Sequence, residues 1–136
     1  MEAENIKDTS KKGELIFICH DESYVYLVNS YFKDKNISLD IYRDTDLFLE
    51  KLSQYAKDVK ICIDNSIKPE MSSLALAKQL YESGYIRLYL LSGWDFDKNM
   101  EHEIDYLPAP YNIPKYITAI RKDEKMLESL VALAML

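Results

Sequence analysis

Short apolar runs separated by amphipathic stretches constrain the fold of this chain more than any other feature. Three of the runs, residues 15–19, 61–63 and 88–91, are continuously apolar. A strand has this composition when both faces of its sheet are covered, as in the centre of a parallel sheet. Two further runs, 38–42 and 104–107, are alternating or short, and we place them nearer the edges. The pattern predicts five strands.

The segments between these runs repeat apolar residues at helical spacing. Ser72 or Ser73 can cap the third of these helices, and Gly84 suits its C-terminal end because a left-handed residue is favoured there. The expected helices are 24–32, 47–55, 73–83, a shorter one at 95–103, and a last one that opens at Ile113-Pro114. Strand and helix therefore alternate five times, which predicts an α/β fold with a doubly wound parallel sheet.

Length and composition fit one domain, because 136 residues with 48% hydrophobic content can form a single core. Residues 1–13 are polar and show no periodicity, so we expect a disordered lead-in. The domain is expected to span residues 14–122. Residues 123–136 are expected to form an extension of the last helix.

Several functional classes are disfavoured by charge and composition. Seventeen basic against 23 acidic residues give a net charge of −6, whereas nucleic-acid binding needs clustered Lys and Arg. No apolar run approaches the roughly 20 residues that span a bilayer, and the N-terminus is too charged for a signal peptide, so we expect a cytoplasmic protein. Cys19 and Cys62 lack the spacing of a zinc or redox pair and are expected to be reduced core thiols.

Polar side chains follow three of the central strands. Asp21 comes after the first, Asp64 after the third and Ser92 after the fourth. Because parallel strands end at one edge of their sheet, these groups should meet there. A single acid after a strand often caps the next helix, but two adjacent carboxylates repel each other unless a cation lies between them. The spacing therefore points to a magnesium site.

This constellation resembles the receiver domain of bacterial response regulators over about residues 14–122. The resemblance implies a flavodoxin-like sheet of order 2-1-3-4-5 and a signalling module that is not an enzyme. It also implies a phospho-acceptor at Asp64, Mg²⁺ ligands from Asp21, Asp64 and the carbonyl of Ser66, a hydroxyl switch at Ser92 beside Gly93, and an aromatic switch at Tyr106 on the fifth strand.

Two departures from the family pattern bear on function. His20 stands in place of the first acid, and Ala109 stands where the family has the lysine that pairs with the acyl phosphate. Lys115 falls in the expected last helix and is not expected to substitute. We therefore expect Asp64 to accept phosphate weakly from a histidine kinase or histidine phosphotransfer protein, or the chain to act as a pseudo-receiver that signals through protein contacts.

Two alternatives belong to other functional classes. One is a structural interaction module that uses this fold without phosphotransfer. The other, a flavin- or nucleotide-binding domain, is disfavoured because the chain has three glycines and none forms a phosphate-cradling loop after the first strand.

The C-terminal segment carries an apolar stripe that includes Leu127, Leu130 and Val131. An isolated domain should not leave such a stripe exposed. The simplest cover is a second copy of the chain, which predicts a homodimer through this helix. The alternative is that the segment folds back on its own domain.

Overall fold

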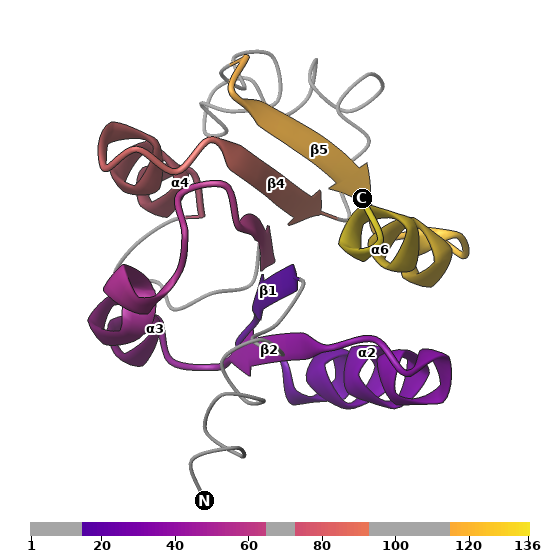
Figure 1. Ribbon diagram of the computed structural model, residues 1–136. Helices are drawn as coiled ribbons and strands as arrows, with labels where there is room; N and C mark the ends of the chain where they lie inside the picture. The colour runs from indigo at the N-terminus through magenta and orange to yellow at the C-terminus, as the bar shows by residue number, and fades with distance from the viewer. Residues whose placement is uncertain (1–14, 65–72, 93–114) are drawn as a thin grey trace, which may run out of the picture.

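Five parallel strands form one sheet in the computed structural model, which describes residues 15–64, 73–92 and 115–136 (Figure 1). The sheet order is β2-β1-β3-β4-β5, so the predicted doubly wound fold and its strand order are confirmed. The strands are β1 (Leu15–Ile18), β2 (Leu39–Tyr42), β3 (Lys60–Asp64), β4 (Arg87–Ser92) and β5 (Ile117–Arg121).

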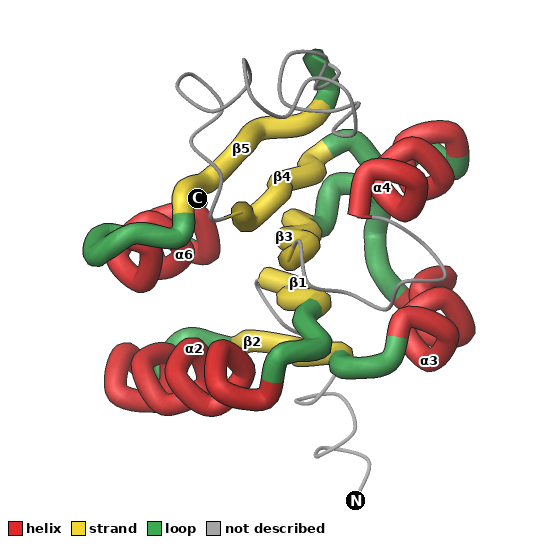
Figure 2. The backbone as a smooth tube through the Cα atoms, turned by 180° about the vertical axis from the view of Figure 1, so that it is seen from behind, coloured by secondary structure: helices red, strands yellow, loops and turns green. Residues whose placement is uncertain are grey.

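Helices cover both faces of the sheet, as Figures 1 and 2 show. They are α2 (Glu22–Lys35), α3 (Thr45–Lys51), which continues into the 3-10 helix η1 (Leu52–Gln54), α4 (Ser73–Glu82) and α6 (Met126–Ala134). Successive side chains of a strand point to opposite faces. Ile16 and Ile18 of β1 accordingly pack with α3 and α4, whereas Leu15 and Phe17 pack with α2 and α6.

The helix ends follow from their capping residues. Asp21 precedes α2 and accepts a hydrogen bond from the backbone N–H of Ser23, and Asn36 ends the helix in the left-handed region at φ 58°. Gly84, at φ 101°, follows the end of α4. These observations confirm the three helices predicted before residue 84. The predicted helix 95–103 and strand 104–107 lie outside the described residues.

The last predicted helix is wrong at its start. Residues 117–121 form β5, which pairs in parallel with β4, so that Ile117 lies opposite Leu88 and Arg121 opposite Ser92. The physical reason is local: Ile117, Thr118 and Ile120 are β-branched, and such side chains favour a strand over a helix. The final helix begins only at Met126, after a turn in which Asp123 Oδ1 accepts the backbone N–H of Lys125.

Helix α6 belongs to the core of the domain and is not an extension beyond it. Leu130 is fully buried, and Leu127 and Val131 are half-buried against the same cluster, which includes residues of β1 and β3. Lys60 of β3 donates hydrogen bonds from Nζ to the carbonyls of Leu133, at 3.0 Å, and Ala134, at 3.1 Å. The domain's own core therefore covers the apolar stripe. No second copy of the chain is needed to bury it, so the stripe no longer argues for a homodimer.

The helices of the described segments are all too short or too polar to cross a membrane.

Candidate functional site

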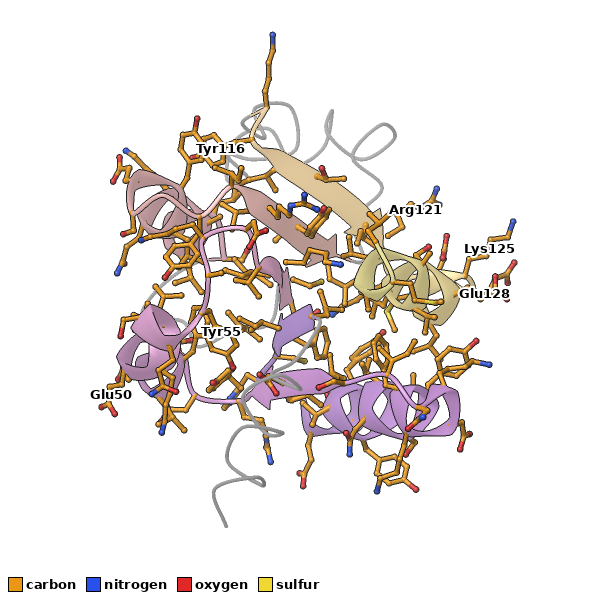
Figure 3. All side chains as sticks on the ribbon, in the orientation of Figure 1. Glu50, Tyr55, Tyr116, Arg121, Lys125 and Glu128 are labelled. Atoms are coloured by element: carbon orange, nitrogen blue, oxygen red, sulfur yellow. The ribbon has the colours of Figure 1, made fainter. Side chains whose placement is uncertain are left out.

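The carboxyl edge of the sheet holds a buried ion pair. Asp64 ends β3, and its side chain is 0% exposed. Arg121, labelled in Figure 3, marks the carboxyl end of β5, and Lys122 is the next residue. Its Nζ lies 2.6 Å from Asp64 Oδ1, and the lysine side chain is 12% exposed. A cation therefore pairs with the predicted acceptor carboxylate.

This ion pair corrects the expectation drawn from Ala109. Ala109 was expected to leave Asp64 without a cation because the fifth strand was placed at 104–107. The fifth strand of the described sheet is β5, and the residue that follows it is Lys122. Lys115 lies exposed in the turn before β5 and not in a helix. Ala109 itself lies outside the described residues.

The second oxygen of Asp64 has a thiol neighbour. Cys19 follows β1, which is paired with β3 so that Ile18 lies opposite Ile63. This register brings the Cys19 thiol to Asp64, where it donates to Oδ2 at a sulfur–oxygen distance of 3.5 Å. Burial, followed by the charge of Asp64, raises the pKa of Cys19 from 9.0 to about 12, so the group stays a neutral donor.

The cysteines are otherwise as predicted. Cys19 and Cys62 are both free thiols buried in the core. Burial also raises the pKa of Cys62. Because the thiolate is the reactive form, both groups are poor nucleophiles and poor metal ligands in the folded protein.

An aromatic ring also contacts the Lys122 ammonium. Tyr24 belongs to the first turn of α2, and its ring centroid lies 4.3 Å from Lys122 Nζ. The ring is half-buried and also packs against the core cluster shared by α2 and α6. Lys122 therefore contacts a carboxylate and an aromatic face. Lys122, the Cys19 donor and Tyr24 are the three features of this site that the sequence reasoning missed.

Asp21 lies at the same edge of the sheet. The Cys19 thiol contacts the backbone oxygen of Asp21 at 3.6 Å and the carboxylate of Asp64 at 3.5 Å, so the backbone of Asp21 lies beside the thiol that contacts Asp64. Oδ1 of Asp21 accepts the N–H of Ser23 at 2.9 Å, so the capping role and the predicted ligand role fall on one residue. His20, in place of the first family acid, is exposed.

The predicted magnesium site can be tested against the donors present. Two carboxylates at one sheet edge are the hard oxygen ligands that suit Mg²⁺. Among residues 15–64, 73–92 and 115–136, no cluster of three or more His, Cys, Asp or Glu side chains could hold a metal ion. The third predicted ligand, the carbonyl of Ser66, lies outside these residues. The donors fit the ion in kind, and the site stays a prediction.

The remaining predicted residues are placed in part. Ser92 is the last residue of β4, which lies between β3, ending at Asp64, and β5, in which Arg121 pairs with Ser92. Gly93 and Tyr106 lie outside the described residues. The fifth strand of the described sheet, Ile117–Arg121, has no aromatic side chain, and the predicted switch role of Tyr106 stays a prediction.

Comparisons with known proteins bear on the fold. No family model matches the sequence, and no curated protein matches it. A solved structure, the signal receiver domain of an HD domain-containing protein from Pseudomonas fluorescens Pf-5, superposes with a TM-score of 0.61. The match has 16% sequence identity and covers 91% of this chain and 93% of that one. The chain therefore has the fold of a signal receiver domain.

Proposed function

We propose that this chain is a receiver domain of two-component signalling that accepts a phosphoryl group on Asp64. The observation that carries the proposal is the ion pair between Asp64, at the end of β3, and Lys122, directly after β5. The pair joins the proposed acceptor acid to a lysine that follows the fifth strand, where receiver domains carry the lysine that pairs with the acyl phosphate. The donor would be a histidine kinase or a histidine phosphotransfer protein, and the output a change in protein contacts.

The transfer is a nucleophilic displacement at phosphorus. An oxygen of Asp64 attacks the phosphorus of a phosphohistidine whose other ring nitrogen carries a proton. The P–N bond breaks, its electron pair stays on nitrogen, and neutral imidazole leaves. The product is an acyl phosphate on Asp64. Lys122 is placed to pair with the negative charge on the phosphoryl oxygens, and such preorganised charge is a large part of catalysis in buried sites. Mg²⁺, held by Asp21, Asp64 and the carbonyl of Ser66, would supply further neutralising charge when bound.

Lys122 changes the expected strength of this reaction. The expectation of weak acceptance depended mainly on Ala109 in place of the lysine, and the contact at 2.6 Å supplies that missing charge. We therefore propose ordinary phosphoacceptance, with His20 as the departure that remains. A module without phosphotransfer is the second candidate, favoured by the complete burial of Asp64, which a donor must reach.

The test is chemical labelling with a small phosphodonor such as acetyl phosphate in the presence of Mg²⁺. Intact-protein mass spectrometry should show the addition of one phosphoryl group, and hydroxylamine should remove it, as expected of an acyl phosphate. Asp64→Asn should abolish the addition. Asp58→Asn changes an exposed acid away from the site and should label like the wild type. A wild-type protein that stays unlabelled at saturating donor and Mg²⁺ would favour the interaction module.

A further inference from the structure

We infer that Tyr24 is a positioning residue of the Asp64 site: its ring face holds the Lys122 ammonium in the orientation that phosphoryl transfer needs. This inference depends on the proposed phosphoacceptor function. Two contacts of the Lys122 ammonium carry it: Nζ lies 2.6 Å from Asp64 Oδ1 and 4.3 Å from the Tyr24 ring centroid.

Lysine is a flexible side chain, and a single contact leaves its ammonium free to move. A lysine side chain has four rotatable bonds and one point charge, so a single ion pair does not fix the direction from which it approaches. An aromatic face attracts a cation within about 6 Å of its centroid, and more strongly where water is excluded. Lys122 is only 12% exposed, so this contact is largely shielded from water. Tyr24 is therefore a second contact that restricts the position of the ammonium beside Asp64.

The position of Tyr24 is itself well determined. Asp21 caps α2, so Tyr24 lies in the first helical turn directly beside the carboxyl edge of the sheet. The ring also packs against the core cluster that contains Phe17 and Met126. A ring anchored in this way can support Lys122 while Asp64 changes from a carboxylate to an acyl phosphate. The ammonium then needs only a small movement to pair with the phosphoryl oxygens.

The test separates the ring face from simple bulk. Tyr24→Phe keeps the aromatic face, whereas Tyr24→Leu keeps apolar packing and removes the face. We expect Tyr24→Leu to slow labelling by acetyl phosphate about tenfold and Tyr24→Phe to label at close to the wild-type rate. Tyr31→Leu is the matched control, because Tyr31 lies on the same helix, packs against the same cluster and faces a different lysine, Lys35, at 4.8 Å.

A double-variant cycle then tests whether Tyr24 acts through Lys122. In a Lys122→Met background, Tyr24→Leu should cause no further loss of labelling rate, because the ring has no ammonium left to hold. A second readout does not depend on phosphorylation: the ε-methylene protons of Lys122 should show an upfield ring-current shift in NMR spectra that Tyr24→Leu removes and Tyr24→Phe keeps.

The outcomes are distinguishable. If the wild type is labelled and Tyr24→Leu labels at the same rate, the inference is overturned while the proposed function stands. The same holds if Tyr24→Leu slows labelling equally in the Lys122→Met background, or if Tyr31→Leu has an equal effect. If the wild type takes up no phosphate, the proposed function fails, and the inference fails with it.

Discussion

Replacement of Lys122 by methionine should destabilise this protein far more than replacement of its partner. Asp64 is 0% exposed and Lys122 is 12% exposed. In Lys122→Met, the Asp64 carboxylate stays buried but loses the positive charge at 2.6 Å from Oδ1. Removal of one partner of a buried ion pair costs about 3–5 kcal/mol, and we expect the free energy of unfolding to fall by that amount at neutral pH.

The converse replacement, Asp64→Asn, should behave differently. It removes the more deeply buried charge and leaves an ammonium whose side chain is 12% exposed and flexible. Such a lysine can move its charge into water while its methylenes stay packed. We expect a cost within about 1 kcal/mol, and a double variant that resembles Asp64→Asn alone. The difference between the unfolding free energies of Lys122→Met and Asp64→Asn measures the cost of leaving the Asp64 carboxylate buried without its cation.

Urea unfolding followed by far-ultraviolet circular dichroism measures all three variants. Lys115→Met, which removes an exposed lysine in the turn before β5, is the control. Equal small losses for Lys122→Met and Asp64→Asn that add in the double variant would refute the buried ion pair.

Two further predictions concern the core. Leu130→Ala should lower the free energy of unfolding by about 2–5 kcal/mol, because Leu130 is fully buried against its own sheet, and light scattering should show no change of oligomeric state. Leu136→Ala, at an 81% exposed position, is the control. Dissociation of a dimer by Leu130→Ala would contradict the packing of Leu130 within its own chain. Cys19 should resist a thiol reagent in the folded protein. Folding raises the pKa of Cys19 from 9.0 to about 12, so the thiol loses its proton at a lower pH in the unfolded chain than in the folded protein. The free energy of unfolding should therefore fall as the pH rises above about 9. Cys19→Ala should make that fall smaller, as measured by the urea midpoint at each pH.

The sheet centre was predictable because burial leaves a strong signal in sequence. The runs around Ile16, Ile61 and Leu88 are apolar on both faces, and the structure buries all three side chains completely or nearly so. Their ends then place Asp21 and Asp64 at one edge with no knowledge of side-chain packing. The capping residues of α2 and the glycine after α4 are equally local signals, which explains why the early helices were predicted within a few residues.

The fifth strand was not predictable in the same way, because an edge strand carries a weaker pattern. In β5, Ile117 is buried but Thr118 and Ala119 are exposed, so the segment lacks a continuous apolar run. The proline at 114 and the apolar residues further on also suit a helix. The sequence does contain a signal for this strand: the β-branched segment 117–121 is followed by Lys122 and then by the separate amphipathic stretch 126–134. Giving more weight to β-branching than to the proline would have found it.

The position of the fifth strand changes which of two sequence departures, His20 and Ala109, is expected to weaken the site. His20 and Ala109 both seemed to weaken the site, but only the loss of an acid at His20 remains once Lys122 is placed against Asp64. In the proposed site, Asp21 and Asp64 would provide two carboxylates for a divalent cation where the pattern of the resembled family provides three, whereas Lys122 would still face the phosphoryl group. Cation affinity follows the number of charged ligands, and transition-state stabilisation follows the charge placed at the reacting group. His20 should therefore raise the Mg²⁺ concentration that labelling requires, and the rate at saturating Mg²⁺ should depend on Lys122.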